Sequence, residues 1–180
     1  GQIGDTGTIQ TEHAMIAVND TKTLNNIIVH LGTVMKGKIT TNEKAISKID
    51  KKRREAIRRN HSATHLLHYV LRQVIGQHAE QSGSLVAADR FRFDFHHFAG
   101  ITKDELARIE EMINEMIMEN TRVSVQEMTL NEAQETGAVA LFGEKYSENV
   151  KVVNIGNFSR ELCGGTHVIS TGQIGLFKII

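Results

Sequence analysis

Two pairs of side chains in this sequence have the spacing and chemistry of metal ligands. His61 and His65 lie four residues apart in HSATH, and Cys163 and His167 have the same spacing in ELCGGTH. Residues four apart on a helix project from the same side, so both imidazoles of the first pair can face one ion. The glycines between Cys163 and His167 predict a sharp turn rather than a helix. Together the four residues predict a tetrahedral Zn²⁺ site, because thiolate and imidazole suit zinc better than magnesium or calcium.

The neighbouring residues limit the chemistry of such a site. HSATH has Ser62 where the HExxH motif of zinc proteases carries a glutamate base. Four protein ligands close the zinc shell, whereas a catalytic zinc normally keeps one position for water. His68 continues the histidine series by about one turn, and we do not assign it as a ligand. The zinc could therefore be structural, could position a substrate, or could have one labile ligand.

The composition is that of an ordinary globular protein with an uneven charge distribution. Of 180 residues, 40% are hydrophobic and 23% charged, the net charge is +0, and there is one cysteine. A lone cysteine cannot form an internal disulfide and no apolar run could span a bilayer, so we expect a cytoplasmic protein without membrane contact. Residues 48–59 hold seven basic and two acidic side chains. Such a stretch can meet phosphate, although a solvated helix face is the simpler interpretation.

The pattern of apolar residues predicts strands, then a long helix, then mixed elements. Residues 8–40 are typical of short strands broken at 19–20 and 37, and apolar residues from Ile46 to Val74 recur near helical spacing until Gly76. That spacing indicates one long helix or two in succession. The alternation in RFRFDFHHF predicts a strand with a buried aromatic face, and an RNA-stacking platform is the less favoured alternative.

The rest of the sequence completes an α+β pattern. ITKDELARIEEMINEMIMEN predicts a helix with a capping box at Thr102 and Glu105. RVSVQEMTL, VKVVNIGNF and IGLFKII predict strands, and NEAQETGA a short helix. We predict an α+β fold with a mostly antiparallel sheet packed against helices, preceded by a small β-barrel-like subdomain. The predicted domains are 1–50 for the barrel-like part and 51–180 for the zinc-containing part.

Two long segments resemble a known family. HSATHLLHYVLRQVIGQHAEQSGSLVAADRFRFDF and FSRELCGGTHVISTGQIGLFKI resemble the editing domain of alanyl-tRNA synthetase, and GQIGDTG resembles the glycine-rich motif of the barrel that precedes it. The editing domain of threonyl-tRNA synthetase and free-standing alanyl-tRNA editing proteins share the general scheme. The resemblance covers nearly the whole chain, and we expect the chain to be an excised editing fragment.

The resemblance implies an aminoacyl-tRNA ester hydrolase that removes serine or glycine from mischarged tRNA(Ala). An alanine pocket cannot strongly exclude these amino acids, because such small differences are worth only about 1–3 kcal/mol. The resemblance marks Thr64 and Gln81 as catalytic and substrate-binding residues of the pocket, with Thr64 as the contact for the serine hydroxyl and Gln81 as an amide that could orient water or the ester. Without the resemblance, the sequence would predict that Thr64 is a helical threonine bonded to its own turn and that Gln81 is a loop glutamine. Arg58 and Arg59 precede the metal-binding turn and could meet phosphates of the tRNA acceptor end.

Two other functions remain open at this point. One is a zinc-stabilised tRNA-binding module without catalytic activity, which a closed shell and the basic residues 48–59 would favour. The other is a zinc hydrolase of small esters or amides. The residue that activates water is not identified, and a monomeric fragment is expected.

Overall fold

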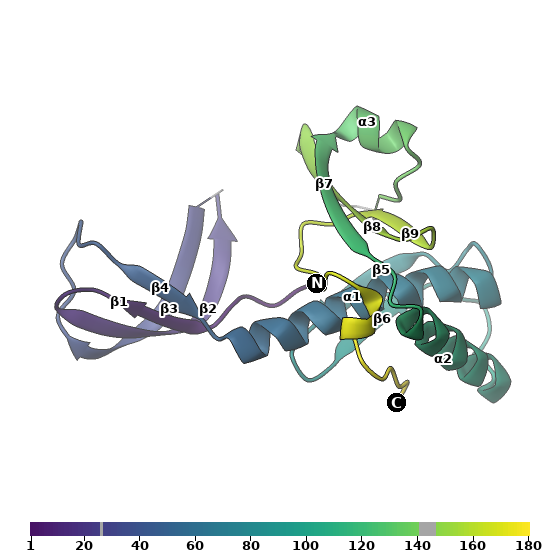
Figure 1. The fold of residues 1–180 in the computed structure, drawn as a ribbon, viewed down its shortest axis with the longest axis horizontal. Helices are drawn as coiled ribbons and strands as arrows, with labels where there is room; N and C mark the ends of the chain where they lie inside the picture. Colours follow the sequence, from purple (N-terminus) through teal and green to yellow (C-terminus); the bar gives the residue numbers. More distant parts are fainter. Residues whose placement is uncertain (26, 141–146) are drawn as a thin grey trace. The chain divides into compact units, whose positions relative to one another are not determined.

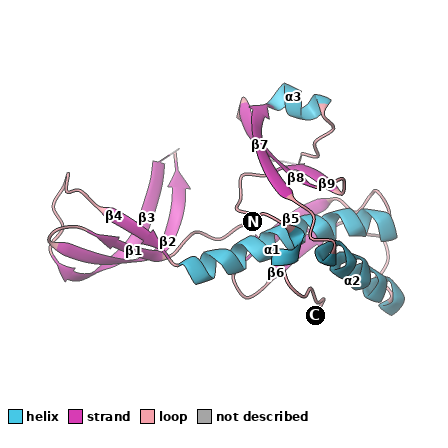
Figure 2. Cartoon of the chain, viewed as in Figure 1, coloured by secondary structure: helices cyan, strands magenta, loops and turns pink. Residues whose placement is uncertain are grey.

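The structure is a computed structural model that describes residues 1–25, 27–140 and 147–180. The chain divides into two compact units, Ile3–Ala56 on the one hand and Gly1–Gln2 with Ile57–Ile180 on the other. The described residues form helices and antiparallel strands, as Figures 1 and 2 show, and the predicted α+β class is confirmed. The predicted boundary between residues 50 and 51 stays a prediction.

The unit Ile3–Ala56 is a four-stranded antiparallel sheet. Its strands are β1 (Gly7–Gln10), β2 (Ala14–Leu24), β3 (Ile27–Gly37) and β4 (Ile46–Ile49), in the order β3-β2-β1-β4. Within the described part of the chain β3 and β4 do not pair, so the sheet is open. The expected barrel-like closure is therefore wrong, because each outer strand keeps one unpaired edge.

Two local predictions in this unit are also wrong. The break expected at Asn19-Asp20 is a β-bulge inside β2, because one extra residue shifts the register between Val18 and Asp20 without ending the strand. Ile46 and Ile49, which fitted the helical spacing, belong to β4 and pair with β1. Two apolar residues three apart satisfy a helical pattern by coincidence.

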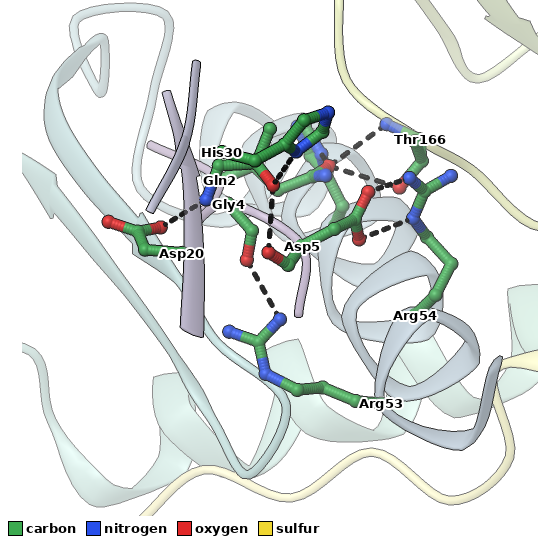
Figure 3. A network of polar contacts seen from close by, with 10 residues as sticks. Gln2, Gly4, Asp5, Asp20, His30, Arg53, Arg54 and Thr166 are labelled. Carbon is green, nitrogen blue, oxygen red and sulfur yellow. Dashed lines mark hydrogen bonds and ion pairs between the residues drawn. The ribbon is translucent and has the colours of Figure 1, made fainter. Parts of the chain in front are cut away.

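Two arginines of the basic residues 48–59 make polar contacts within this unit, as Figure 3 shows. Arg54 forms an ion pair with Asp5, in which Nε donates to Oδ1 at 2.7 Å, and Arg53 donates to the carbonyl of Gly4 at 2.8 Å. The Asp5 carbonyl in turn accepts from the Thr21 hydroxyl at 3.0 Å. These contacts tie the N-terminal strand segment to the start of the following helix.

The unit that holds Ile57–Ile180 is built around one long helix. Its elements are α1 (Lys51–Val74), whose first turns lie in the other unit, β5 (Gln81–Val86), β6 (Phe91–Phe95), α2 (Lys103–Met118), β7 (Val123–Thr129), α3 (Leu130–Glu135), β8 (Asn149–Ile155), β9 (Ser159–Leu162) and a short 3-10 helix (Thr171–Gln173). The strands β5 and β6 form a hairpin, and β7, β8 and β9 form a sheet in that order, all antiparallel. The capping box at Thr102 and Glu105 is confirmed.

The larger of two cores in this unit joins α1 and α2 to its sheets. Leu66 and Val70 of α1 are buried with Ile109 and Ile113 of α2 and with Ile155 of β8. The phenylalanines of β6 are half-buried against this same core, which is the predicted core role. Burial of these side chains fixes the face of α1 that points inward, and so fixes where its histidines lie.

The segment 174–180 is not the strand that the sequence predicts. Its backbone is held by side chains of α2: the amide of Phe177 donates to Asn114 Oδ1 at 2.9 Å, and that of Ile179 donates to Glu110 Oε2 at 3.0 Å. Because α2 satisfies these groups, the segment needs no neighbouring strand. Among the helices of the described ranges, none has the length and apolar character needed to cross a membrane.

Candidate metal centre

The two predicted ligand pairs converge in the structure. One donor atom from each of His61, His65, Cys163 and His167 lies within 4.8 Å of the others. The two helical imidazoles stack with ring centroids 5.5 Å apart, and Cys163 Sγ lies 3.3 Å from His61 Nε2. In a tetrahedral zinc site, neighbouring nitrogen and sulfur ligands are about 3.6 Å apart. The group could therefore hold a metal ion with only small movements.

Each histidine of the cluster is anchored through Nδ1, which leaves Nε2 for the shared centre. The Nδ1 atoms contact Gln2 Oε1 at 2.8 Å for His61, Glu161 Oε2 at 2.7 Å for His65, and Ser62 Oγ at 3.3 Å for His167. The Nε2 atoms of His65 and His167 are buried and have no hydrogen-bond partner among the described residues. Buried polar atoms are rarely left unpaired, so these two orphaned nitrogens fit metal ligation.

Glu161 on β9 links two imidazoles of α1. Its carboxylate accepts from His65 at 2.7 Å, from His68 Nδ1 at 3.1 Å and from the Ser159 hydroxyl at 2.9 Å. A carboxylate behind a metal-binding histidine fixes the ring and raises its basicity. His68 thus lies behind the cluster and is not one of its four donors.

The charges of the cluster follow from this arrangement. Burial would raise the pKa of the Cys163 thiol, but the surrounding imidazoles of His167, His61 and His65 outweigh it and lower the pKa to about 3. Burial would lower the pKa of His65, but the Glu161 carboxylate and Cys163 thiolate raise it to about 10. Burial would likewise raise the pKa of Glu161, and the charge of His65 holds it far below its usual value. Burial lowers the pKa of His167 to about 4. A metal ion would take the place of the proton on His65.

The turn between Cys163 and His167 requires glycine at one position only. A Cβ on Gly165 would lie 1.9 Å from Cε1 and 2.3 Å from Nδ1 of His61, whereas a Cβ on Gly164 would meet no atom within 4 Å. The amide of Thr166 then donates to Gln2 Oε1 at 2.9 Å, a contact drawn in Figure 3. The predicted non-helical turn is confirmed, and its close approach to α1 places both pairs of ligands together.

The other predicted site residues have defined local contacts. The Thr64 side chain is buried, and its hydroxyl donates to the carbonyl of Asn60 at 2.8 Å, the bond expected of a helical threonine. The Gln81 amide donates to Ser84 Oγ at 3.3 Å at the start of β5. Arg58 donates to the carbonyl of His167, and Arg59 is half-buried on the same helix. Their contacts with a substrate stay predictions.

Glu161 and Gln2 are the functional residues that the sequence analysis missed. Glu161 stands two residues before Cys163, and on a strand such side chains point to the same face. This spacing could have indicated that Glu161 lies near the metal cluster. No comparable signal marks Gln2, because it reaches His61 across 59 residues of sequence.

The sequence is similar to parts of known proteins. Residues 150–180 match the model of the threonyl and alanyl tRNA synthetase second additional domain. The whole chain is 49% identical to part of the alanine–tRNA ligase of Legionella pneumophila (strain Lens), 51% to that of Wolbachia pipientis wMel and 48% to that of Thermoanaerobacter sp. (strain X514). The resemblance to alanyl-tRNA synthetase is confirmed. The chain covers 21%, 20% and 20% of these three ligases, about a fifth of each. The segment matched by the domain model contains Cys163, His167 and Glu161 and so includes half of the metal cluster.

Proposed function

We propose that the chain is the editing part of an alanine–tRNA ligase and hydrolyses the ester of Ser-tRNA(Ala) and Gly-tRNA(Ala). The observation that supports this most directly is the cluster of three imidazoles and one thiolate in a chain similar throughout to alanine–tRNA ligases. The proposed metal is Zn²⁺, which this donor set suits. When bound, it would polarise an ester carbonyl or a water molecule beside it. tRNA(Ala) is the proposed partner, bound through its acceptor end.

Thr64 is the proposed contact for the serine side chain. Its hydroxyl proton is committed to Asn60, but the oxygen keeps lone pairs that can accept a hydrogen bond from the serine hydroxyl. Alanine lacks this hydroxyl, so binding of alanine would leave a lone pair of the threonine oxygen without a hydrogen-bond donor. In this way the buried Thr64 oxygen can favour hydrolysis of the serine ester over hydrolysis of the alanine ester.

Gln81 and the two arginines have supporting roles in the proposal. The Gln81 amide is only weakly held at 3.3 Å from Ser84, so it can turn toward the ester or a water molecule. Arg58 already donates to the carbonyl of His167, so it would fix the ligand loop, and it is also a proposed phosphate contact. Arg59, one residue further along α1, is the other proposed phosphate contact.

A second candidate is a zinc-stabilised tRNA-binding module without catalytic activity. It is favoured by one specific observation: four side chains converge on one centre, which would complete a tetrahedral shell. In this case the metal would stabilise the fold and the anchoring residues would serve only to hold it.

Deacylation of matched substrates separates the two candidates. The zinc-loaded protein is incubated with Ser-, Gly- and Ala-tRNA(Ala), and the loss of each ester is followed over time. Faster loss of serine and glycine than of alanine, abolished in a folded Cys163→Ala variant, is the expected result. A folded protein that contains zinc and binds tRNA(Ala) but cleaves none of the esters would exclude editing by this chain and leave the binding module.

A further inference from the structure

A polar groove lies behind the metal cluster, on the far side of Glu161. It consists of two adjoining cavities of about 180 and 380 Å³, which share Val139, Phe158, Ser159 and Arg160. The smaller one reaches His68 and Arg72 of α1 and the carboxylate of Glu161. The four metal-ligand residues line neither cavity, so the groove is separate from the site described above.

Two guanidinium groups face the groove with their positive charge uncompensated by the described residues. Arg72 donates to the side-chain oxygen of Gln77, and Arg160 donates to Asn154 Oδ1 at 2.7 Å and to the carbonyl of Thr136 at 3.0 Å. All three acceptors are neutral. Among the residues that the structure describes, no carboxylate lies within ion-pair distance of either arginine. The arginines are thus positioned by neutral groups while their charges remain available to an anion.

Glu161, the one carboxylate among the described residues that line the groove, does not oppose an anion strongly. Glu161 accepts hydrogen bonds from His65, His68 and Ser159. Its two oxygens are therefore already engaged by three donors. Among the described residues that line the groove, two arginines stand against this single carboxylate.

Two buried polar atoms in the groove lack a partner among the described residues. They are Nε of Arg72 and Nε2 of His68, whose side chain is 5% exposed. The first is a permanent donor and needs an acceptor. Because His68 contacts Glu161 through Nδ1, its Nε2 is the ring atom left for a ligand, and a hydroxyl group can pair with it as donor or acceptor. A ligand that fills both positions carries anionic oxygens beside a hydroxyl.

We propose that this groove binds a phosphate group that carries or adjoins a hydroxyl. Its oxygens would accept from Arg72 and Arg160, and the hydroxyl would form a hydrogen bond with Nε2 of His68. The rings of Tyr69 and Phe158, with centroids 5.9 Å apart, form an apolar wall beside these groups. Inorganic phosphate and the ribose phosphates of an RNA strand share this chemistry.

Calorimetric titration of the zinc-loaded chain at fixed ionic strength tests the proposal. The probes are inorganic phosphate, AMP and a five-residue oligoribonucleotide. Arg72→Gln and Arg160→Gln each remove one charge-assisted contact, and each should weaken binding about tenfold or more. Arg90→Gln is the matched control: this arginine pairs with Asp89 at the surface, and its loss should change affinity by less than about twofold. Circular dichroism and melting curves establish that every variant is folded.

The outcomes separate the two sources of phosphate. Tighter binding of the oligonucleotide than of phosphate, with the same dependence on Arg72 and Arg160, assigns the groove to an RNA backbone. Equal affinities assign it to a free phosphate or a nucleotide. Binding of none of the probes, or equal weakening by Arg90→Gln and Arg72→Gln, overturns the proposal. Because binding is measured without an acylated tRNA, failure of the editing activity would not affect this result.

Discussion

Substitution of the two adjacent glycines of the ligand loop should have opposite consequences. In Gly165→Ala the new Cβ would lie 1.9 Å from Cε1 of His61, where a normal carbon–carbon contact is about 3.5–4.0 Å. The ring or the loop must therefore move by about 1.5 Å or more. Metal-ligand distances tolerate only about 0.2 Å. The variant should consequently lose His61 as a ligand, or should lose Cys163 and His167 together.

The expected size of this effect is large. Loss of an anchoring contact alone costs about 10- to 100-fold in metal affinity, so displacement of a ligand should cost about 100-fold or more, which corresponds to about 2.7 kcal/mol or more. Gly164→Ala is the matched control, because its Cβ meets no atom within 4 Å and its backbone is not in a conformation that requires glycine. Zinc affinity is measured by competition with a chromophoric chelator, and circular dichroism checks the fold.

Two results would refute this reasoning. Retention of zinc by Gly165→Ala within about threefold of the wild type would show that the loop can move without loss of a ligand. An equal loss of zinc affinity in Gly164→Ala would show that the loop needs backbone freedom rather than space beside His61.

Three further predictions concern the same unit. Glu161→Gln keeps the side-chain volume but removes the charge behind His65, and it should lower zinc affinity about 10- to 100-fold in a chelator competition; unchanged affinity would exclude Glu161 as an anchor. Thr64→Val should reduce the preference for Ser-tRNA(Ala) over Ala-tRNA(Ala) about 10- to 100-fold at constant zinc content, whereas Thr64→Ser should keep this preference. An unaltered ratio of serine to alanine deacylation in the valine variant, or unfolding of both variants, would contradict the assigned contact. Removal of zinc by a chelator should lower the melting temperature of the unit that holds Ile57–Ile180, since binding to the native state alone stabilises it; a calorimetric scan without a shift would contradict a buried metal.

The sequence could predict those parts of the site that depend on local spacing. His61 and His65 lie on one face because a helix brings residues four apart together, and the glycine pair predicts a turn between Cys163 and His167. The helix α2 was equally predictable, since its apolar stripe and its capping box agree. Each of these inferences uses residues within a few positions of one another.

The sequence could not predict features that depend on partners far along the chain. Gln2 and Glu161 anchor imidazoles that lie 59 and 96 residues away, and no local pattern specifies those pairings. The segment 174–180 shows the same limit. Its apolar residues predict a strand, yet Asn114 and Glu110 on α2 take up its backbone groups. The open edge of the sheet in Ile3–Ala56 likewise depends on whether β3 meets β4, which strand propensity alone does not determine.

The three anchors of the cluster differ in strength, and this bears on whether the shell has a labile ligand. His65 is held by a carboxylate at 2.7 Å, His61 by an amide oxygen at 2.8 Å and His167 by a hydroxyl at 3.3 Å. A stronger acceptor behind an imidazole makes the ring a better ligand, so His167 should be bound least firmly. We therefore expect His167→Ala to retain more zinc affinity than His65→Ala in a chelator competition, and to retain deacylation if that position must open to substrate. Equal loss of zinc affinity in both variants would mean that the strength of an anchor does not determine how firmly its histidine binds the metal. The closed shell would then favour a structural metal.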